Sequence, residues 1–325
     1  MKAGLILLGL VAILVAALAA ALTFGGPAQP APMASIGTPF KGVDFSGMPA
    51  PNRFTARDGH ALSYREYSPV GEAARGSVIL VHGSSARSES MHPMARGLAR
   101  AGYTVYALDV RGHSTPDPKG QIGYVGQLED DLEDFLKSVQ PTAPRTLIGF
   151  SAGGGFALRF ASDPRKALFD RYLLLSPFLH QNAPTDRPGT GGWVSIGLPR
   201  IVALALLDRL GITRFHTLPV TAFALDDNAR TFLTPQYAFN LALNFRPRND
   251  WRADIAAATQ PMEVLAGRDD EVFFADRFED AFADAGRPVV VTLVPGVGHI
   301  DMSLKPAAID AVVLALQRLA SPNPK

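Results

Sequence analysis

From about Phe54 onward, short apolar runs that suit β-strands alternate with longer segments whose apolar residues recur at helical spacing. The runs that favour strands are 61–67, 77–81, 104–109, 145–150, 172–176, 262–266 and 289–294, and those that favour helices are 90–101, 128–139, 153–162, 273–285 and 306–319. Such alternation predicts one mostly parallel sheet with helices on both faces. Ligands then bind beyond the carboxyl ends of the strands.

Composition narrows the class of protein. Of the 325 residues, 47% are hydrophobic and 19% are charged, which supplies a large core and argues against disorder. The net charge of +1 gives no basic surface for nucleic acid. The chain has no cysteine, and its seven histidines form no paired ligand motif. Disulfides and thiol chemistry are therefore excluded, and neither a metal nor a cofactor is implied.

The N-terminus carries an uncharged apolar run at 4–24, preceded by Lys2. Its length is close to the roughly 20 residues that a membrane-spanning helix needs. We interpret 1–26 as a membrane anchor or a signal peptide, with small residues for cleavage at 19–21, and the Pro-rich stretch 27–51 as a linker. The single early lysine favours a catalytic domain outside the cytoplasm, periplasmic or extracellular. Cleavage would make the protein secreted.

The strand–helix rhythm is interrupted between about 179 and 248, within a catalytic domain expected to span 52–322. Several prolines and glycines open the interruption, and a helix predicted over 199–210 is apolar on nearly all sides. Two interpretations remain open for this helix. It packs on the domain, or its surplus apolar surface lines an acyl-binding pocket or touches a bilayer.

One motif carries most of the chemistry. Gly149-Phe150-Ser151-Ala152-Gly153 fits G-x-S-x-G and lies between a predicted strand and a predicted helix, the context that this motif requires. The glycines permit a sharp turn that lifts the Ser151 hydroxyl clear of the sheet. The following helix points its first N–H groups at developing negative charge. Ser151 is therefore the predicted nucleophile.

A nucleophilic serine needs a base and an acid that orients it. His299 follows the strand predicted at 289–294, within a glycine-containing loop that can reach Ser151. The order serine, acid, histidine along the chain suits this assignment. After the preceding strand stand three adjacent acids, Asp269, Asp270 and Glu271. Glu271 is expected to face solvent, so Asp269 and Asp270 are the candidates for the orienting acid.

The loop after the strand at 77–81 is the candidate oxyanion hole. Gly83 lets the chain fold over, so that the backbone N–H of Ser84, together with that of Ala152, can donate to the reacting carbonyl oxygen. His82 is interpreted as a brace for this loop rather than as a base. Asp109 and His113, which follow the next strand, are interpreted as parts of a structured loop together with Arg111.

These segments together resemble the α/β-hydrolase superfamily, and within it the monoacylglycerol lipase, lysophospholipase and S33 serine aminopeptidase-like group. The resemblance covers about 52–320 and implies a sheet of about eight strands with a helical cap, here 179–248, inserted after the sixth. It implies Ser151, Asp270 and His299 as the catalytic triad, and so selects Asp270 among the three acids. The chain departs from the group's usual residues at Ser84, Phe150, Ala152 and Ser114, which weakens the lipase assignment in particular.

The resulting expectation is a serine hydrolase that cleaves lipid-like or short to medium acyl esters through an acyl-enzyme. One alternative is an aminopeptidase or amidase on the same fold, which an acidic cluster in the cap would favour. Another is a membrane-anchored binding protein without catalysis. The natural substrate and the oligomeric state stay open.

Overall fold

The computed structural model describes residues 2–71, 74–114, 118–188 and 192–321. The predicted catalytic range 52–322 thus includes a few positions outside the described residues, at 72–73, 115–117, 189–191 and 322. Eight strands form one sheet in the order β1-β2-β4-β3-β5-β6-β10-β11. Their bounds are β1 Asn52–Thr55, β2 Ala61–Tyr67, β3 Ser77–Val81, β4 Thr104–Leu108, β5 Arg145–Phe150, β6 Arg171–Leu175, β10 Met262–Gly267 and β11 Val290–Val294.

The sheet is parallel except at one edge. β1 pairs antiparallel with β2, and β2 pairs antiparallel with β4, whereas β4, β3, β5, β6, β10 and β11 are joined by parallel pairs. The carboxyl ends of these parallel strands lie along one edge, which is where loops from β3, β5, β10 and β11 can meet. The predicted α/β-hydrolase fold with about eight strands is confirmed.

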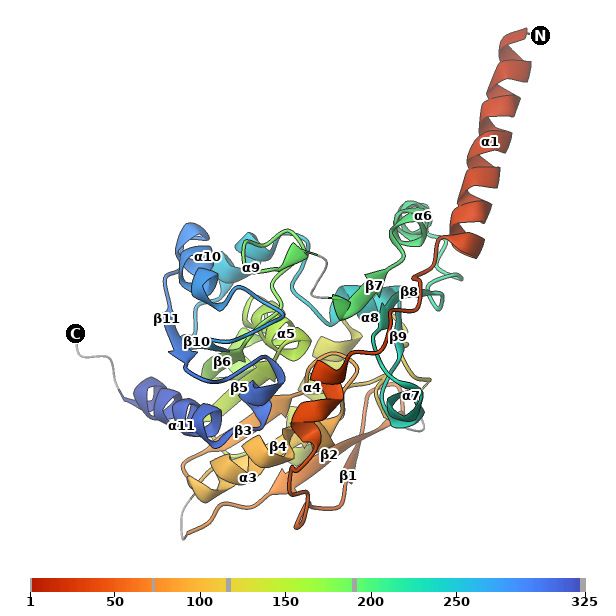
Figure 1. The fold of residues 1–325 in the computed structure, drawn as a ribbon. Coiled ribbons are helices and arrows are strands. Elements are labelled where there is room, and N and C mark those ends of the chain that lie inside the picture. Colours follow the sequence, from red (N-terminus) through yellow and green to blue (C-terminus); the bar gives the residue numbers. More distant parts are fainter. Residues whose placement is uncertain (1, 72–73, 115–117, 189–191, 322–325) are drawn as a thin grey trace.

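Helices cover both faces of the sheet, as Figure 1 shows, and each face has its own buried cluster. α3 (His92–Arg100) and α11 (Pro306–Ala320) supply one cluster. The other face is covered by α4 Gln127–Val139, α5 Ala152–Ala161, α9 Trp251–Ala257 and α10 Phe278–Asp284. Short 3-10 helices lie at Ser88–Met91, Lys166–Leu168, Ala275–Arg277 and Ile300–Ser303.

Two predicted helices are shorter in the structure. The segment expected at 90–101 begins as a 3-10 turn, and α3 starts at His92 because Pro93 suits the first turn of an α-helix. The segment expected at 273–285 becomes α-helical only at Phe278. Before that point, the backbone N–H groups of Val272 and Phe273 donate to the carboxylate of Asp270, which holds this stretch in a loop.

The insertion between β6 and β10 contains the predicted helix as α6, Leu198–Arg209. It also contains a three-stranded antiparallel sheet that sequence patterning did not indicate, in the order β7-β8-β9. The strands are β7 Val194–Ile196, β8 Pro219–Phe223 and β9 Gln236–Ala238. Helix α7, Asp227–Phe232, lies between β8 and β9, and α8, Phe239–Asn244, follows β9. Strands of three to five residues are too short for alternation to reveal.

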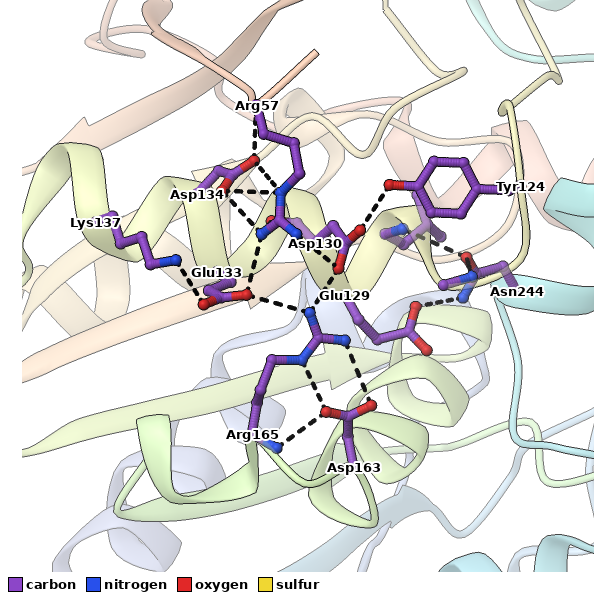
Figure 2. Close-up of polar contacts among 12 residues, drawn as sticks. Arg57, Tyr124, Glu129, Asp130, Glu133, Asp134, Lys137, Asp163, Arg165 and Asn244 are labelled. Carbon is purple, nitrogen blue, oxygen red and sulfur yellow. Dashed lines mark hydrogen bonds and ion pairs between the residues drawn. The ribbon is translucent and has the colours of Figure 1, made fainter.

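Acidic residues at the start of α4 are engaged in ion pairs (Figure 2). Arg57 pairs with Asp130 at 3.2 Å, and Arg165 pairs with the same carboxylate at 2.6 Å. Glu129 is only 1% exposed and accepts a hydrogen bond of 2.6 Å from the amide of Asn244 in α8. The contact between Asn244 and Glu129 fastens the insertion to the helix layer beneath it.

The chain before β1 begins with α1, Lys2–Phe24, which projects away from the rest of the molecule in Figure 1. The carboxyl end of α1 contacts α6, where the Arg200 guanidinium donates to the carbonyl oxygens of Leu22 and Thr23 at 2.9 and 3.1 Å. A cation suits the negative end of the helix dipole. Two short helices follow, α2 (Ala34–Gly37) and a 3-10 helix at Thr38–Phe40.

Candidate active site

Ser151 stands at a sharp turn between β5 and α5, with φ of 55° and ψ of −118°. A non-glycine residue rarely adopts positive φ, so the surrounding backbone must hold it there. Both flanking positions require glycine because the neighbouring backbone leaves no room for a side chain. A Cβ on Gly149 would lie 2.0 Å from the Gly153 carbonyl oxygen, and one on Gly153 would lie 2.3 Å from that of His82. The Ser151 N–H donates to the Leu175 carbonyl at 2.9 Å.

His299 lies within hydrogen-bonding distance of this serine. Its Nε2 is 3.0 Å from Ser151 Oγ, although the two residues are separated by 148 positions. The imidazole packs between two phenyl rings, with centroid distances of 5.0 Å to Phe150 and 5.1 Å to Phe273. Phe150, one of the departures from the related group, therefore helps to fix the orientation of the imidazole.

Asp270 is the acid that reaches the imidazole, with Oδ2 2.9 Å from His299 Nδ1. Its other oxygen accepts from the N–H groups of Val272 and Phe273 at 2.9 and 2.8 Å. Burial alone raises the pKa of Asp270, but the adjacent imidazole and these hydrogen bonds outweigh it and lower the pKa below its ordinary value. Asp270 is therefore ionised at neutral pH, accepts from Nδ1, and leaves Nε2 free to accept from the serine.

The neighbouring acids have other environments. Asp269 is exposed to solvent. Glu271 is also exposed, as expected, yet its carboxylate accepts a hydrogen bond of 2.9 Å from the backbone N–H of His299. Glu271 thus braces the loop that carries the histidine, a contact that the sequence did not indicate.

The predicted oxyanion loop, Ser84 and Ser85, lines the same cavity as Ser151. Ala152 is the first residue of α5, so its N–H is among those that a helix leaves without an internal acceptor. Ser85 has φ of 66° and is clamped by the insertion. Its Oγ donates to the Thr234 carbonyl at 2.6 Å, and the Thr234 N–H donates to the Ser85 carbonyl at 2.9 Å.

Tyr237, from β9 of the insertion, is a positioning residue that sequence analysis missed. Its hydroxyl accepts from the Ser85 N–H at 2.6 Å and lies 2.6 Å from His113 Nε2. His113 Nδ1 faces the carbonyl oxygens of Val110 and Arg111, each at 3.2 Å, so Nδ1 carries the proton and Nε2 accepts from the tyrosine. Burial lowers the pKa of His113 well below its ordinary value, which keeps the ring neutral.

The remaining polar residues of these loops have structural contacts that agree with their interpretation. His82 Nδ1 lies 2.8 Å from the Gly83 carbonyl, and its Nε2 accepts from the Val110 N–H at 3.2 Å. Asp109 accepts from the Ser88 N–H at 2.8 Å. Arg111 pairs with Asp131 at 2.7 Å. Among the described residues, no cluster of three or more histidine and acidic side chains has the arrangement of a metal site.

Ser151 and His299 open into a cavity of about 570 Å³, within the size range of small-molecule sites. The insertion supplies part of its wall, including Trp193 and Phe232. Residues between 33 and 45 supply another part. Sequence analysis treated this second segment as a linker, and only its scattered large apolar residues could have pointed to a binding role.

Comparison with known proteins supports the fold and the family. The family described as serine aminopeptidase, S33, matches residues 72–300. A monoacylglycerol lipase of Mycolicibacterium smegmatis is 32% identical over 115 residues, 34% of this chain and 40% of the relative, so the match spans less than half of that enzyme. A putative protein-lysine deacylase of Homo sapiens is 29% identical over 171 residues, 49% of this chain and 75% of the relative.

Among solved structures, a soluble variant of the monoglyceride lipase of Saccharomyces cerevisiae in complex with a substrate analogue superposes with a TM-score of 0.62. The match covers 85% of this chain and 96% of that one at 19% identity. At this level of identity the likeness concerns the fold.

Proposed function

Because this chain belongs to the S33 serine aminopeptidase-like family of α/β-hydrolases, we propose that it cleaves carboxylic esters through an acyl-enzyme on Ser151. The observation that carries the proposal is the contact chain from Ser151 Oγ to His299 Nε2 at 3.0 Å and from His299 Nδ1 to Asp270 at 2.9 Å. Ser151 and His299 line a largely apolar cavity. The arrangement suits nucleophilic catalysis by a hydroxyl.

In the first half-reaction, Ser151 Oγ attacks the ester carbonyl carbon while His299 Nε2 takes the hydroxyl proton. The carbonyl oxygen becomes an oxyanion that the N–H groups of Ser84 and Ala152 stabilise. His299 then gives the proton to the leaving alcohol, which leaves the acyl group on Ser151. Asp270 stabilises the transient imidazolium without taking its proton.

In the second half-reaction, His299 takes a proton from water, and the resulting hydroxide attacks the acyl carbon. The proton returns to Ser151 as the carboxylic acid leaves. Each half-reaction uses the same three side chains, and water is the co-reactant of the second.

The acids around the cavity favour ester substrates over peptides with a free amino group. Three acidic residues line it, and each has a partner. Glu89 pairs with Arg65 at 2.8 Å, Asp226 accepts from the Ala229 N–H at 2.7 Å as the N-cap of α7, and Glu271 accepts from His299. No cluster of unengaged carboxylates is left among the described lining residues to bind an ammonium group, which an aminopeptidase would require.

The test is hydrolysis of p-nitrophenyl esters by the full chain in lipid nanodiscs, beside Ser151→Ala. We expect turnover that falls at least about 10³-fold in the variant. Aminoacyl p-nitroanilides serve as the comparison and should be poorer substrates. Faster anilide cleavage would favour the aminopeptidase alternative. Equal and negligible turnover by both proteins would favour a binding protein without catalysis.

The proposed location is a membrane anchored by α1, with the catalytic domain outside the cytoplasm. α1 has 23 residues, enough to span a bilayer, and none of its described side chains is buried in the protein. A periplasmically active reporter fused after Lys325 would be active under this topology. Activity of a cytoplasmic reporter at the same position would contradict it.

A further inference from the structure

We propose that the cavity-lining side chains of residues 33–45, here called the strap, form a wall of an acyl-chain subsite beside Ser151, so that the segment following α1 selects the substrate's chain length. The proposal rests on the proposed ester hydrolysis and names the part of the substrate that the strap binds. Its ligand is an unbranched aliphatic acyl chain.

The strap presents one apolar face to the cavity. Met33, Ile36 and Phe40 line the cavity and are half-buried, whereas Ala34, Ser35, Gly37 and Thr38 also line it but are exposed. The spacing of three and four residues places these side chains on one side of a helical turn. α2 and the following 3-10 helix provide that turn. The large apolar side chains are therefore the more buried part of this turn, and Ile36 also packs against the core.

The strap is fastened at both ends. At its start, the Met33 N–H donates to the Ala224 carbonyl at 3.1 Å, next to β8 of the insertion. Just before it, the Gln29 side chain donates to the Phe223 carbonyl at 2.9 Å. Near its end, Asp44 pairs with Arg96 of α3 at 3.1 Å. In Figure 1 the chain after α1 accordingly runs along β8 and β9 before it reaches the sheet.

The rest of the cavity wall includes further apolar side chains, Leu233 from the insertion and Val272 and Ile300 from the loops beside the candidate triad. Ser151 and His299 line the same cavity. An acyl group on Ser151 would extend between this wall and the strap. Such a lining favours the burial of methylene groups, because these groups need no hydrogen-bond partners.

The strap lies on the carboxyl side of the small residues at 19–21. Cleavage of a signal peptide at that point would therefore leave it attached to the catalytic domain. The subsite is thus a property of the domain whether α1 stays as an anchor or is removed.

The test compares Ile36→Ala/Phe40→Ala with Val43→Ala in the full chain in lipid nanodiscs, with p-nitrophenyl esters from acetate to decanoate. Val43 is the matched control, since it is half-buried in the same segment but does not line the cavity. For wild type and Val43→Ala, we expect kcat/KM to rise up to about fourfold per buried methylene until the cavity is filled. The double variant should lose at least about tenfold on octanoate and change by less than about twofold on acetate.

A double variant whose length profile superimposes on that of wild type would overturn the proposal while leaving ester hydrolysis intact. Absence of turnover in wild type would instead refute the proposed function. The subsite is then tested by the binding of octanoate to Ser151→Ala, measured through the fluorescence emission of Trp193, which lines the cavity. The variant Trp193→Phe assigns the signal. We expect the strap substitutions to weaken octanoate binding at least about fivefold. Unchanged binding would overturn the subsite.

Discussion

Replacing Tyr237 by Phe removes one hydroxyl and leaves two buried groups without their partner. The Ser85 N–H loses its acceptor at 2.6 Å, and His113 Nε2 loses its donor at 2.6 Å. Leaving a buried polar group unsatisfied costs about 1–3 kcal/mol, so the loss of both partners in Tyr237→Phe should lower the free energy of unfolding by about 2–6 kcal/mol. The tyrosine stays protonated at neutral pH because burial raises the pKa of Tyr237.

The effect on catalysis should separate from the effect on stability. Loss of an oxyanion-hole donor costs about 2.7–4 kcal/mol in the transition state, and Tyr237 holds the residue next to the candidate donor Ser84. A displaced but not deleted donor should lower kcat about 10- to 100-fold and change KM by less than about threefold. Affinity for a trifluoromethyl ketone, which mimics the tetrahedral oxyanion, should fall in parallel with kcat.

The assay is steady-state hydrolysis of p-nitrophenyl butyrate with thermal unfolding of the same samples. Tyr172→Phe is the matched control, since Tyr172 is fully buried and its hydroxyl donates to the Lys166 carbonyl at 2.7 Å. Tyr172 pairs with Leu147, toward the amino end of β5 and away from Ser151. The control should lose stability with kcat unchanged. If Tyr237→Phe lowers Tm yet keeps the wild-type kcat and ketone affinity, the positioning role is refuted.

Three further predictions concern charged groups. Asp270→Asn should lower kcat about 10³- to 10⁴-fold at unchanged expression, whereas Asp269→Asn should stay within about threefold; the reverse ranking would reassign the orienting acid. Burial raises the pKa of Asp186 to about 7, so the cost of this carboxyl to folding grows as pH rises from about 4 to 7. In thermal scans, Asp186→Asn should therefore gain stability relative to wild type between pH 5 and pH 8, and a pH-independent difference would contradict this. In urea titrations, Arg159→Ala should cost about 3–5 kcal/mol of unfolding free energy because it leaves the buried carboxylate of Glu129 without its ion-pair partner. Arg57 is half-exposed, so Arg57→Ala should cost at most about 1 kcal/mol. Equal costs would refute the distinction.

The local motifs were predictable because their constraints are local. Two glycines at fixed spacing around Ser151 are needed to avoid backbone clashes, and the strand before and the helix after are visible in the apolar pattern. The position of His299 after the last strand followed from the parallel topology, which brings carboxyl ends of strands to one edge. Sequence patterning therefore predicted the mostly parallel sheet and the positions of Ser151 and His299 at this edge, whereas the resemblance to α/β-hydrolases selected Asp270.

Other parts of the site were beyond sequence patterning because they arise from contacts between distant segments. Tyr237 and Ser85 are 152 positions apart, and no periodicity marks either residue as the partner of the other. The choice among three adjacent acids depends on loop geometry, in which Asp270 turns inward and Asp269 remains exposed. The strap resembles a linker in composition, and its inward face is defined only once the cavity beneath it exists.

The most direct test of the central claim is covalent labelling of the folded full chain with a fluorophosphonate, followed by mass spectrometry of the peptide that contains Ser151. We expect stoichiometric phosphonylation of Ser151 in the native protein and none after unfolding, because the reactivity depends on His299 at 3.0 Å. Labelling at another residue, or no labelling of native protein that is folded by thermal scan, would contradict the assignment of Ser151 as the nucleophile.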